Sequence, residues 1–109
     1  MEDRVEISLL MDIYRPLLTE KQKNIMELYY NDDLSLAEIA ELNNTSRQAI
    51  HDLIKRCYKQ ILSYEDKLNL LKKSLEKQSV IEALLNDMKK KYSIEEKDLE
   101  EYKDILFNL

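Results

Sequence analysis

Apolar positions recur at helical spacing along almost the whole chain of 109 residues. The first such pattern predicts a helix over about residues 3–14. We expect Val5, Leu9 and Ile13 to form its buried stripe, flanked by Ile7, Leu10 and Tyr14. Pro16 disfavours helical geometry at the residue before it, so the first helix should end near Arg15.

Helix starts are indicated by a repeated local signal. A Ser or Thr followed three residues later by Gln or Glu has the spacing of a capping box, in which each residue bonds the backbone N–H of the other. We therefore expect helices to begin after residues 19, 35, 79 and 93, with the third start bending a longer helix near residues 77–79. The pairs are Thr19 and Gln22, Ser35 and Glu38, Ser79 and Glu82, and Ser93 and Glu96.

The centre of the chain predicts two helices joined by a tight turn. Residues 36–42 form two helical turns, and residues 43–45 break the pattern. Ala40 is small enough for a close helix crossing, and Asn44 suits a turn position with positive φ. Ser46 should cap the second helix, with an inward face that we expect to comprise Ile50, Leu53, Ile54, Cys57 and Ile61. This is the pattern of a helix-turn-helix.

Composition supports an all-α fold. The chain has no glycine and one proline, so the usual residues of sheet turns and bulges are missing. An apolar stripe continues after residue 64 through Leu68, Leu71 and Leu75, which predicts a helical extension. We therefore expect a helix-turn-helix domain at residues 1–64 and an extension at residues 65–109 that serves dimerisation and packing.

The charge distribution is more informative than the net charge of −5. Residues 1–44 carry −6 and residues 93–109 carry −4, but residues 45–62 carry +3. Arg, Gln and Lys side chains suit contacts with base edges and phosphates, so the exposed side of the second helix is a candidate nucleic-acid-binding surface. Its candidate residues are Ser46, Arg47, Gln48, His51, Lys55, Arg56 and Lys59.

Other chemistry has little support in the sequence. Without glycine there is no phosphate-cradling loop, and one histidine and one cysteine offer no nucleophile and base pair and no metal-ligand cluster. We expect neither an enzyme nor a cofactor.

The sequence also lacks the pattern of a signal peptide and of a membrane-spanning stretch, so we expect a cytoplasmic protein. Two features stay open: Tyr30 can pack or stack on a base, and Lys89, Lys90 and Lys91 can bind RNA or end a helix.

The central segment resembles a known family. The stretches L-T-E-K-Q, E-L-Y-Y-N-D-D-L-S-L-A-E-I-A-E and S-R-Q-A-I are similar to region 4 of bacterial sigma factors and more closely to the YlxM proteins. The likeness covers nearly the whole chain and is strongest over residues 18–64. It departs from the family pattern in the turn, where Asn43 and Asn44 replace an apolar residue and a glycine.

The resemblance implies a sigma region 4-like helix-turn-helix with a helical extension, commonly a homodimer. Such proteins are encoded beside the GTPase of the signal recognition particle. It therefore implies an accessory or regulatory protein that binds DNA or RNA, with signal recognition particle RNA as one candidate. The alternative is an adaptor that binds the GTPase itself and has no direct contact with nucleic acid.

Overall fold

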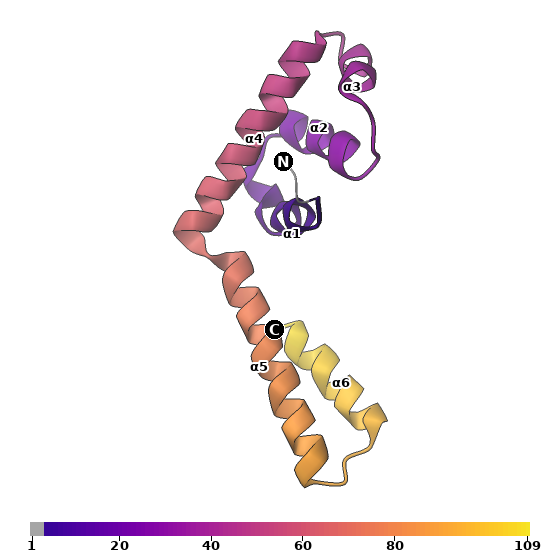
Figure 1. The fold of residues 1–109 in the computed structure, drawn as a ribbon, viewed down its shortest axis with the longest axis vertical. Helices are drawn as coiled ribbons and strands as arrows, with labels where there is room; N and C mark the ends of the chain where they lie inside the picture. Colours follow the sequence, from indigo (N-terminus) through magenta and orange to yellow (C-terminus); the bar gives the residue numbers. More distant parts are fainter. Residues whose placement is uncertain (1–3) are drawn as a thin grey trace. The chain divides into compact units, whose positions relative to one another are not determined.

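The computed structural model describes residues 4–109, and they form helices joined by short connections, with no strand among them (Figure 1). The chain divides into two compact units, an N-terminal unit that ends at Leu71 and a C-terminal unit from Lys72 to Leu109. The elements are α1 (Arg4–Tyr14), a 3-10 turn (Arg15–Leu17), α2 (Glu20–Tyr30), α3 (Leu36–Leu42), α4 (Arg47–Leu68), α5 (Leu70–Lys91) and α6 (Glu96–Phe107).

The local signals of the first half are confirmed. Helix α1 gives way to the 3-10 turn at Pro16. The Thr19 hydroxyl accepts a bond from the Gln22 amide at 3.1 Å, and the Gln22 side chain accepts one from the Thr19 amide at 3.0 Å. Ser35 and Glu38 form the same reciprocal pair ahead of α3, with both bonds at 3.1 Å. Each box satisfies amides that the first helical turn leaves unpaired.

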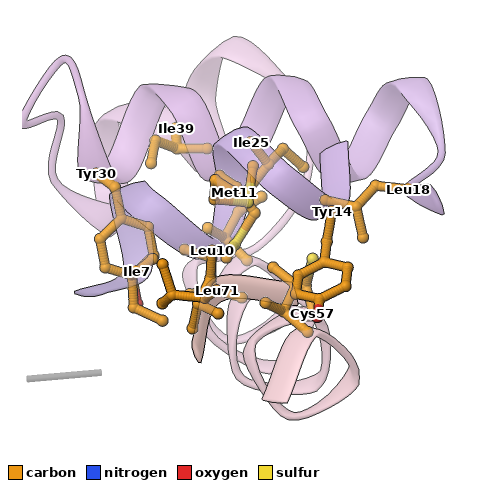
Figure 2. Close-up of a cluster of buried hydrophobic side chains, with 14 of the residues drawn as sticks. Ile7, Leu10, Met11, Tyr14, Leu18, Ile25, Tyr30, Ile39, Cys57 and Leu71 are labelled. Carbon is orange, nitrogen blue, oxygen red and sulfur yellow. The ribbon is translucent and has the colours of Figure 1, made fainter. Parts of the chain in front are cut away.

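The core of the N-terminal unit corrects the expectation for α1. The helix buries Ile7, Leu10, Met11 and Tyr14 against α2 and α4 (Figure 2), whereas Val5 is 72% exposed. The sequence carries two apolar stripes on nearly opposite sides of this helix. Of the expected stripe, Val5 and Leu9 are exposed, whereas Ile13 is partly buried against the core. Helical period alone does not distinguish two such stripes. The expected start at Asp3 lies outside the described residues.

Two further expectations, both about helix starts, are wrong. Ser79 lies inside α5, which runs from Leu70 to Lys91 without a break. Helix α6 begins at Glu96 after Glu95, which makes no side-chain cap bond, so Ser93 caps nothing. Ile94 packs against the small core of the C-terminal unit, and this holds residues 92–95 outside the helix. A capping-box spacing is compatible with a helix interior, since continuing backbone hydrogen bonds already satisfy the amides.

The break in the long helix falls at Asn69 instead of residues 77–79. Asn69 adopts the left-handed conformation with φ 53°, which asparagine tolerates better than most residues. The first amides of α5 are then satisfied by side chains. The Tyr14 hydroxyl accepts a bond from the Leu70 amide at 3.3 Å, and Glu65 accepts one from the Leu71 amide at 3.0 Å. Leu71 joins the core of the N-terminal unit, while Leu68 is exposed.

The C-terminal unit is a pair of helices with a small core. Ile81 and Leu85 of α5 and Leu99 of α6 are buried. The partly buried residues around them are Met88, Ile94, Leu106 and Phe107. Ion pairs between Lys89 and Glu96 and between Lys103 and Glu82 connect the two helices. The assignment of dimerisation to residues 65–109 stays a prediction.

Candidate nucleic-acid interface

Helices α3 and α4 pack as the sequence predicts for a helix-turn-helix. Ala40 is buried at their crossing, and Ile39, Ile50 and Ile54 are buried around it. Asn44 has φ 52°, which confirms the expected positive φ in the turn. Asn43, the other departure from the family pattern, bonds its side-chain amide to the Ile39 carbonyl at 2.8 Å and so closes the end of α3.

Helix α4 separates an inner from an outer face along its first half. Its start is capped by the Ser46 hydroxyl, which accepts a bond from the Ala49 amide at 3.0 Å. Ile50, Ile54 and Cys57 are buried, and Leu53 is partly buried against the same core. The candidate contacts lie on the other side and are exposed, except for His51, which is half-buried.

The structure gathers the candidate side chains around two shallow depressions on the outer side of α4. The first is lined by Arg47, Gln48 and His51 together with Leu36 from the start of α3. The second is lined by Lys55, Arg56 and Lys59 together with Asp52. We call these seven polar residues and Ser46 the α4 outer face. Its Arg and Lys members are Arg47, Lys55, Arg56 and Lys59.

The cations of the α4 outer face differ from many other cations of the chain. Arg4 pairs with Asp33, Arg15 with Glu27 and Lys23 with Glu20. Among the described residues, by contrast, no ion pair engages Arg47, Lys55, Arg56 or Lys59. The charge of this face is therefore available for a ligand with negative charge.

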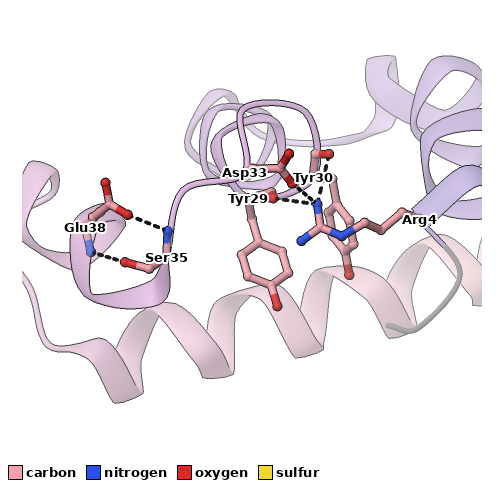
Figure 3. A network of polar contacts seen from close by, with 6 residues as sticks. All are labelled: Arg4, Tyr29, Tyr30, Asp33, Ser35 and Glu38. Atoms are coloured by element: carbon pink, nitrogen blue, oxygen red, sulfur yellow. Dashed lines mark hydrogen bonds and ion pairs between the residues drawn. The ribbon is translucent and has the colours of Figure 1, made fainter.

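The two adjacent tyrosines of α2 serve the fold. Tyr30 is buried and Tyr29 partly buried, with their rings edge to face at 4.9 Å between centroids. The Arg4 guanidinium lies over both rings and donates to both backbone carbonyls at 3.3 Å (Figure 3). Burial, followed by the neighbouring tyrosines, raises the pKa of Tyr30 to about 12. This resolves the open question of Tyr30, because a buried ring is not free to stack on a base.

Cys57 is likewise a core residue. Its side chain is buried without a disulfide, and burial raises the pKa of its thiol to about 11. A thiol of this kind is protonated near neutral pH and therefore a poor nucleophile. Within residues 4–109, no cluster of three or more potential metal ligands occurs, and no helix is long and apolar enough to span a membrane.

Sequence reasoning missed two features of this region. Arg4 connects the start of α1 to the end of α2, and its role depends on residues 25 to 29 positions away. Asp52 bonds Gln48, with Gln48 Nε2 donating to Asp52 Oδ1 at 3.0 Å. The second contact has a sequence signal, since residues four apart face each other on a helix.

The packing of α3 against α4, the asparagine turn between them and the exposed polar side of α4 define a helix-turn-helix protein. Comparison with known proteins agrees with this class and identifies the family within it. The model of the family UPF0122, the YlxM / p13-like helix-turn-helix proteins, matches residues 1–105, and the chain belongs to this family.

Relatives match over the length of the chain. A UPF0122 protein of Clostridium botulinum (strain Alaska E43 / Type E3) is 67% identical over 109 residues, which is 100% of both chains. A UPF0122 protein of Clostridium perfringens (strain SM101 / Type A) is 57% identical and covers 95% of this chain and 92% of its own. A UPF0122 protein of Clostridium novyi (strain NT) is 64% identical over 81% of this chain and 79% of its own.

Proposed function

We propose that this protein binds nucleic acid through the α4 outer face and acts as a regulatory or accessory factor. The observation that carries the proposal is the set of four cations without ion pairs on the exposed side of the second helix of a helix-turn-helix. In a chain of net charge −5, this local excess of positive charge has to be explained. A polyanionic ligand explains it, because cations near phosphates displace condensed counterions.

The face suggests two kinds of contact along one helix. From Arg47 to Lys59 the helix advances about 18 Å at 1.5 Å per residue. We propose that Arg47 and Gln48 near the helix start contact bases or sugars and that Lys55, Arg56 and Lys59 contact phosphates, with His51 making one polar contact. Ser46 uses its oxygen as the helix cap, and its O–H remains a possible donor to a phosphate.

A binding titration tests the proposal directly. The full-length protein is titrated at low and physiological salt against a mixed-sequence DNA duplex, signal recognition particle RNA and an unrelated RNA of equal length. The test variant is Arg47→Ala/Lys55→Ala. The matched control is Lys67→Ala/Lys97→Ala, which removes the same charge from exposed positions outside the α4 outer face.

We expect saturable binding that the test variant weakens at least tenfold and the control changes little. The log–log salt slope should fall by about 0.7–0.9 in the test variant, because Lys55 is the one of its two cations that we propose to contact a phosphate. Equal weakening by both variants would mean that net charge alone drives binding, and it would refute a site on α4.

The particular ligand that we propose is RNA of the signal recognition particle. This rests on the likeness to the YlxM proteins and their association with that particle. Preference for this RNA over the unrelated RNA and the duplex would support it, and preference for the duplex would favour a transcription regulator. If no nucleic acid binds, the adaptor of the particle's GTPase becomes the better hypothesis, with the exposed Glu38, Glu41 and Leu42 of α3 as its candidate contacts.

We also propose that the C-terminal unit supports a homodimer. It buries three residues and leaves large apolar side chains exposed on both helices, including Val80 and Leu84 of α5 and Tyr102 and Ile105 of α6. Sedimentation over a concentration series should show a dimer that Ile105→Asp dissociates and that exposed Val5→Asp in the N-terminal unit does not. A monomer at micromolar concentration would refute this part of the proposal.

A further inference from the structure

Asp52 is an acidic residue among the cations of the α4 outer face. It lies four residues after Gln48 and three and four residues before Lys55 and Arg56, so helical geometry brings all three within reach. A carboxylate in this position repels phosphates and lowers general affinity for nucleic acid. Because we propose that this surface binds phosphates, Asp52 should have a role that offsets the affinity that its charge removes.

The contacts of Asp52 point to that role. Its Oδ1 atom accepts a hydrogen bond from Gln48 Nε2 at 3.0 Å. The described structure shows no ion pair between Asp52 and Lys55 or Arg56, although both are close enough in sequence to form one. The cations therefore stay available for phosphates, and the carboxylate is engaged with a neutral amide.

This bond determines which way the Gln48 amide is turned. An ionised carboxylate only accepts hydrogen bonds, so the amide nitrogen must face Asp52 and the carbonyl oxygen must face away. Repulsion between Oε1 and the carboxylate favours the N–H that points away from Oε1 for this bond. The other N–H then lies beside Oε1, and the two form a donor and acceptor pair.

The donor and acceptor pair of Gln48 lies at a surface depression that a ligand can enter. Gln48 lines the first depression of the face together with Arg47, His51 and the apolar Leu36. His51 Nδ1 lies 3.6 Å from the same Asp52 oxygen and makes no hydrogen bond in the described structure. An adjacent donor and acceptor complement the N7 and N6 atoms of an adenine edge, which accept and donate in turn.

We propose that Asp52 is a positioning residue that holds Gln48 ready to recognise an adenine edge. The inference rests on the proposed function, which it deepens by naming the base. Asp52 lowers general affinity through its charge and raises selectivity through Gln48. The same adenine edge is offered by the major groove of a DNA duplex and by an unpaired base of an RNA loop.

Selection from random-sequence pools tests the inference. The full-length protein selects ligands from a random DNA duplex pool and from a random RNA hairpin-loop pool, and sequencing gives the base preference at each position. The variants are Gln48→Ala, Asp52→Ala, Asp52→Asn and Gln48→Ala/Asp52→Ala. The control is Asp66→Ala, which removes an exposed carboxylate from the same helix about 21 Å away at 1.5 Å per residue.

We expect wild-type protein to prefer adenine at one position by about tenfold, within the range of a good bidentate contact. Gln48→Ala and Asp52→Ala should each abolish the preference, and the double variant should lose no more than either one, because Asp52 acts through Gln48. Asp52→Asn keeps an acceptor oxygen and should keep most of the preference. Asp52→Ala should also bind the unselected pool several-fold more tightly.

The inference is overturned by an adenine preference that survives Asp52→Ala, by losses that add in the double variant, or by an equal loss in Asp66→Ala. Binding without any adenine preference would overturn this inference and leave the proposed function in place. If wild-type protein selects nothing from either pool, the proposed function and the inference fail together. Circular dichroism of each variant establishes that α4 remains helical.

Discussion

The N-terminal and C-terminal units use the same kind of amphipathic helix but bury very different numbers of residues. The core cluster of the N-terminal unit contains fifteen buried residues, whereas that of the C-terminal unit contains three. In the first unit, α4 packs against α1, α2 and α3, so several apolar stripes meet on one helix. The C-terminal unit offers each helix a single neighbour. Apolar side chains on the other side of a helix therefore stay exposed, as Tyr102 and Ile105 of α6 do.

This difference separates a unit with a large core of its own from one with a small core. Units below about 40 residues seldom bury enough surface to offset the loss of chain entropy. The C-terminal unit, from Lys72 to Leu109, is of this size. We therefore expect this unit to gain stability from its covalent connection to the N-terminal unit through α5 and, in our proposal, from a second copy of the chain.

Cutting the chain between the units gives the largest expected effect. A fragment of residues 1–71 should keep its helicity and unfold cooperatively in urea, because it retains the large core. A fragment of residues 72–109 should be mostly unfolded at micromolar concentration. Circular dichroism of both fragments checks this, and a concentration-independent folded state of the shorter fragment would contradict the comparison.

Truncating one core residue in each unit should have the next largest effect. Ile54→Ala removes a fully buried side chain at the centre of the N-terminal unit and should lower its free energy of unfolding by about 2–5 kcal/mol. In the full-length protein, Leu85→Ala should leave the unfolding of residues 1–71 nearly unchanged, because Leu85 belongs to the other core. Urea unfolding of the full-length variants, monitored by amide hydrogen exchange in each unit, measures both effects.

Val5→Ala provides the control for this comparison. Its side chain is exposed, so we expect a change within about 0.5 kcal/mol. If Val5→Ala lowered the free energy of unfolding as much as Ile7→Ala does, the side of α1 that carries Val5 would have to be buried.

Removing one hydroxyl at the helix break should have a smaller effect. Tyr14 donates a hydrogen bond to Glu65 at 2.6 Å and accepts one from the Leu70 amide. Tyr14→Phe leaves both partners short of a bond and should cost about 1–3 kcal/mol in urea unfolding. Tyr102→Phe, at an exposed position of the C-terminal unit, should cost almost nothing.

The same substitution has a consequence at high pH. Burial and then the hydrogen bond to Glu65 raise the pKa of Tyr14 above its usual 10. The stability linked to this shift is therefore complete below pH 10 and is lost as the pH rises through the raised value. Tyr14→Phe should lose less stability than wild type over that range. Parallel curves for both proteins would contradict the assignment.

The helix caps should give the smallest effects. Ser35→Ala removes half of a formed capping box and should cost about 1 kcal/mol. Ser93→Ala should change stability by less than about 0.5 kcal/mol, because Ser93 caps nothing. Thermal unfolding of the two variants measures the difference. Equal losses would mean that the box at Ser93 forms in solution.

Much of the candidate site was predictable because it depends on one helix. The period of apolar residues identified the buried face of α4 and hence its exposed side chains. The absence of ion pairs at Arg47 and Lys55 was not predictable, because it depends on which side chains other elements bring near. The contacts of Arg4 with Tyr29 and Tyr30 could not be predicted for the same reason.

The sequence by itself determined the features that depend on neighbouring residues. Pro16 ended α1, Thr19 and Ser35 capped α2 and α3, and Asn44 took the turn with positive φ. Each involves atoms within about four residues, so the local residue types are sufficient.

Tertiary structure decided the features for which local patterns offered two solutions. Helix α1 buries Ile7 instead of Val5 because only one side of it meets α2 and α4. The long helix breaks at Asn69, where Tyr14, a residue from α1, satisfies the amide of Leu70. Ser79 has the local signal for a break but remains within α5. At Asn69, unlike at the caps of α2 and α3, the break therefore relies on a hydrogen-bond partner 56 residues away in the sequence.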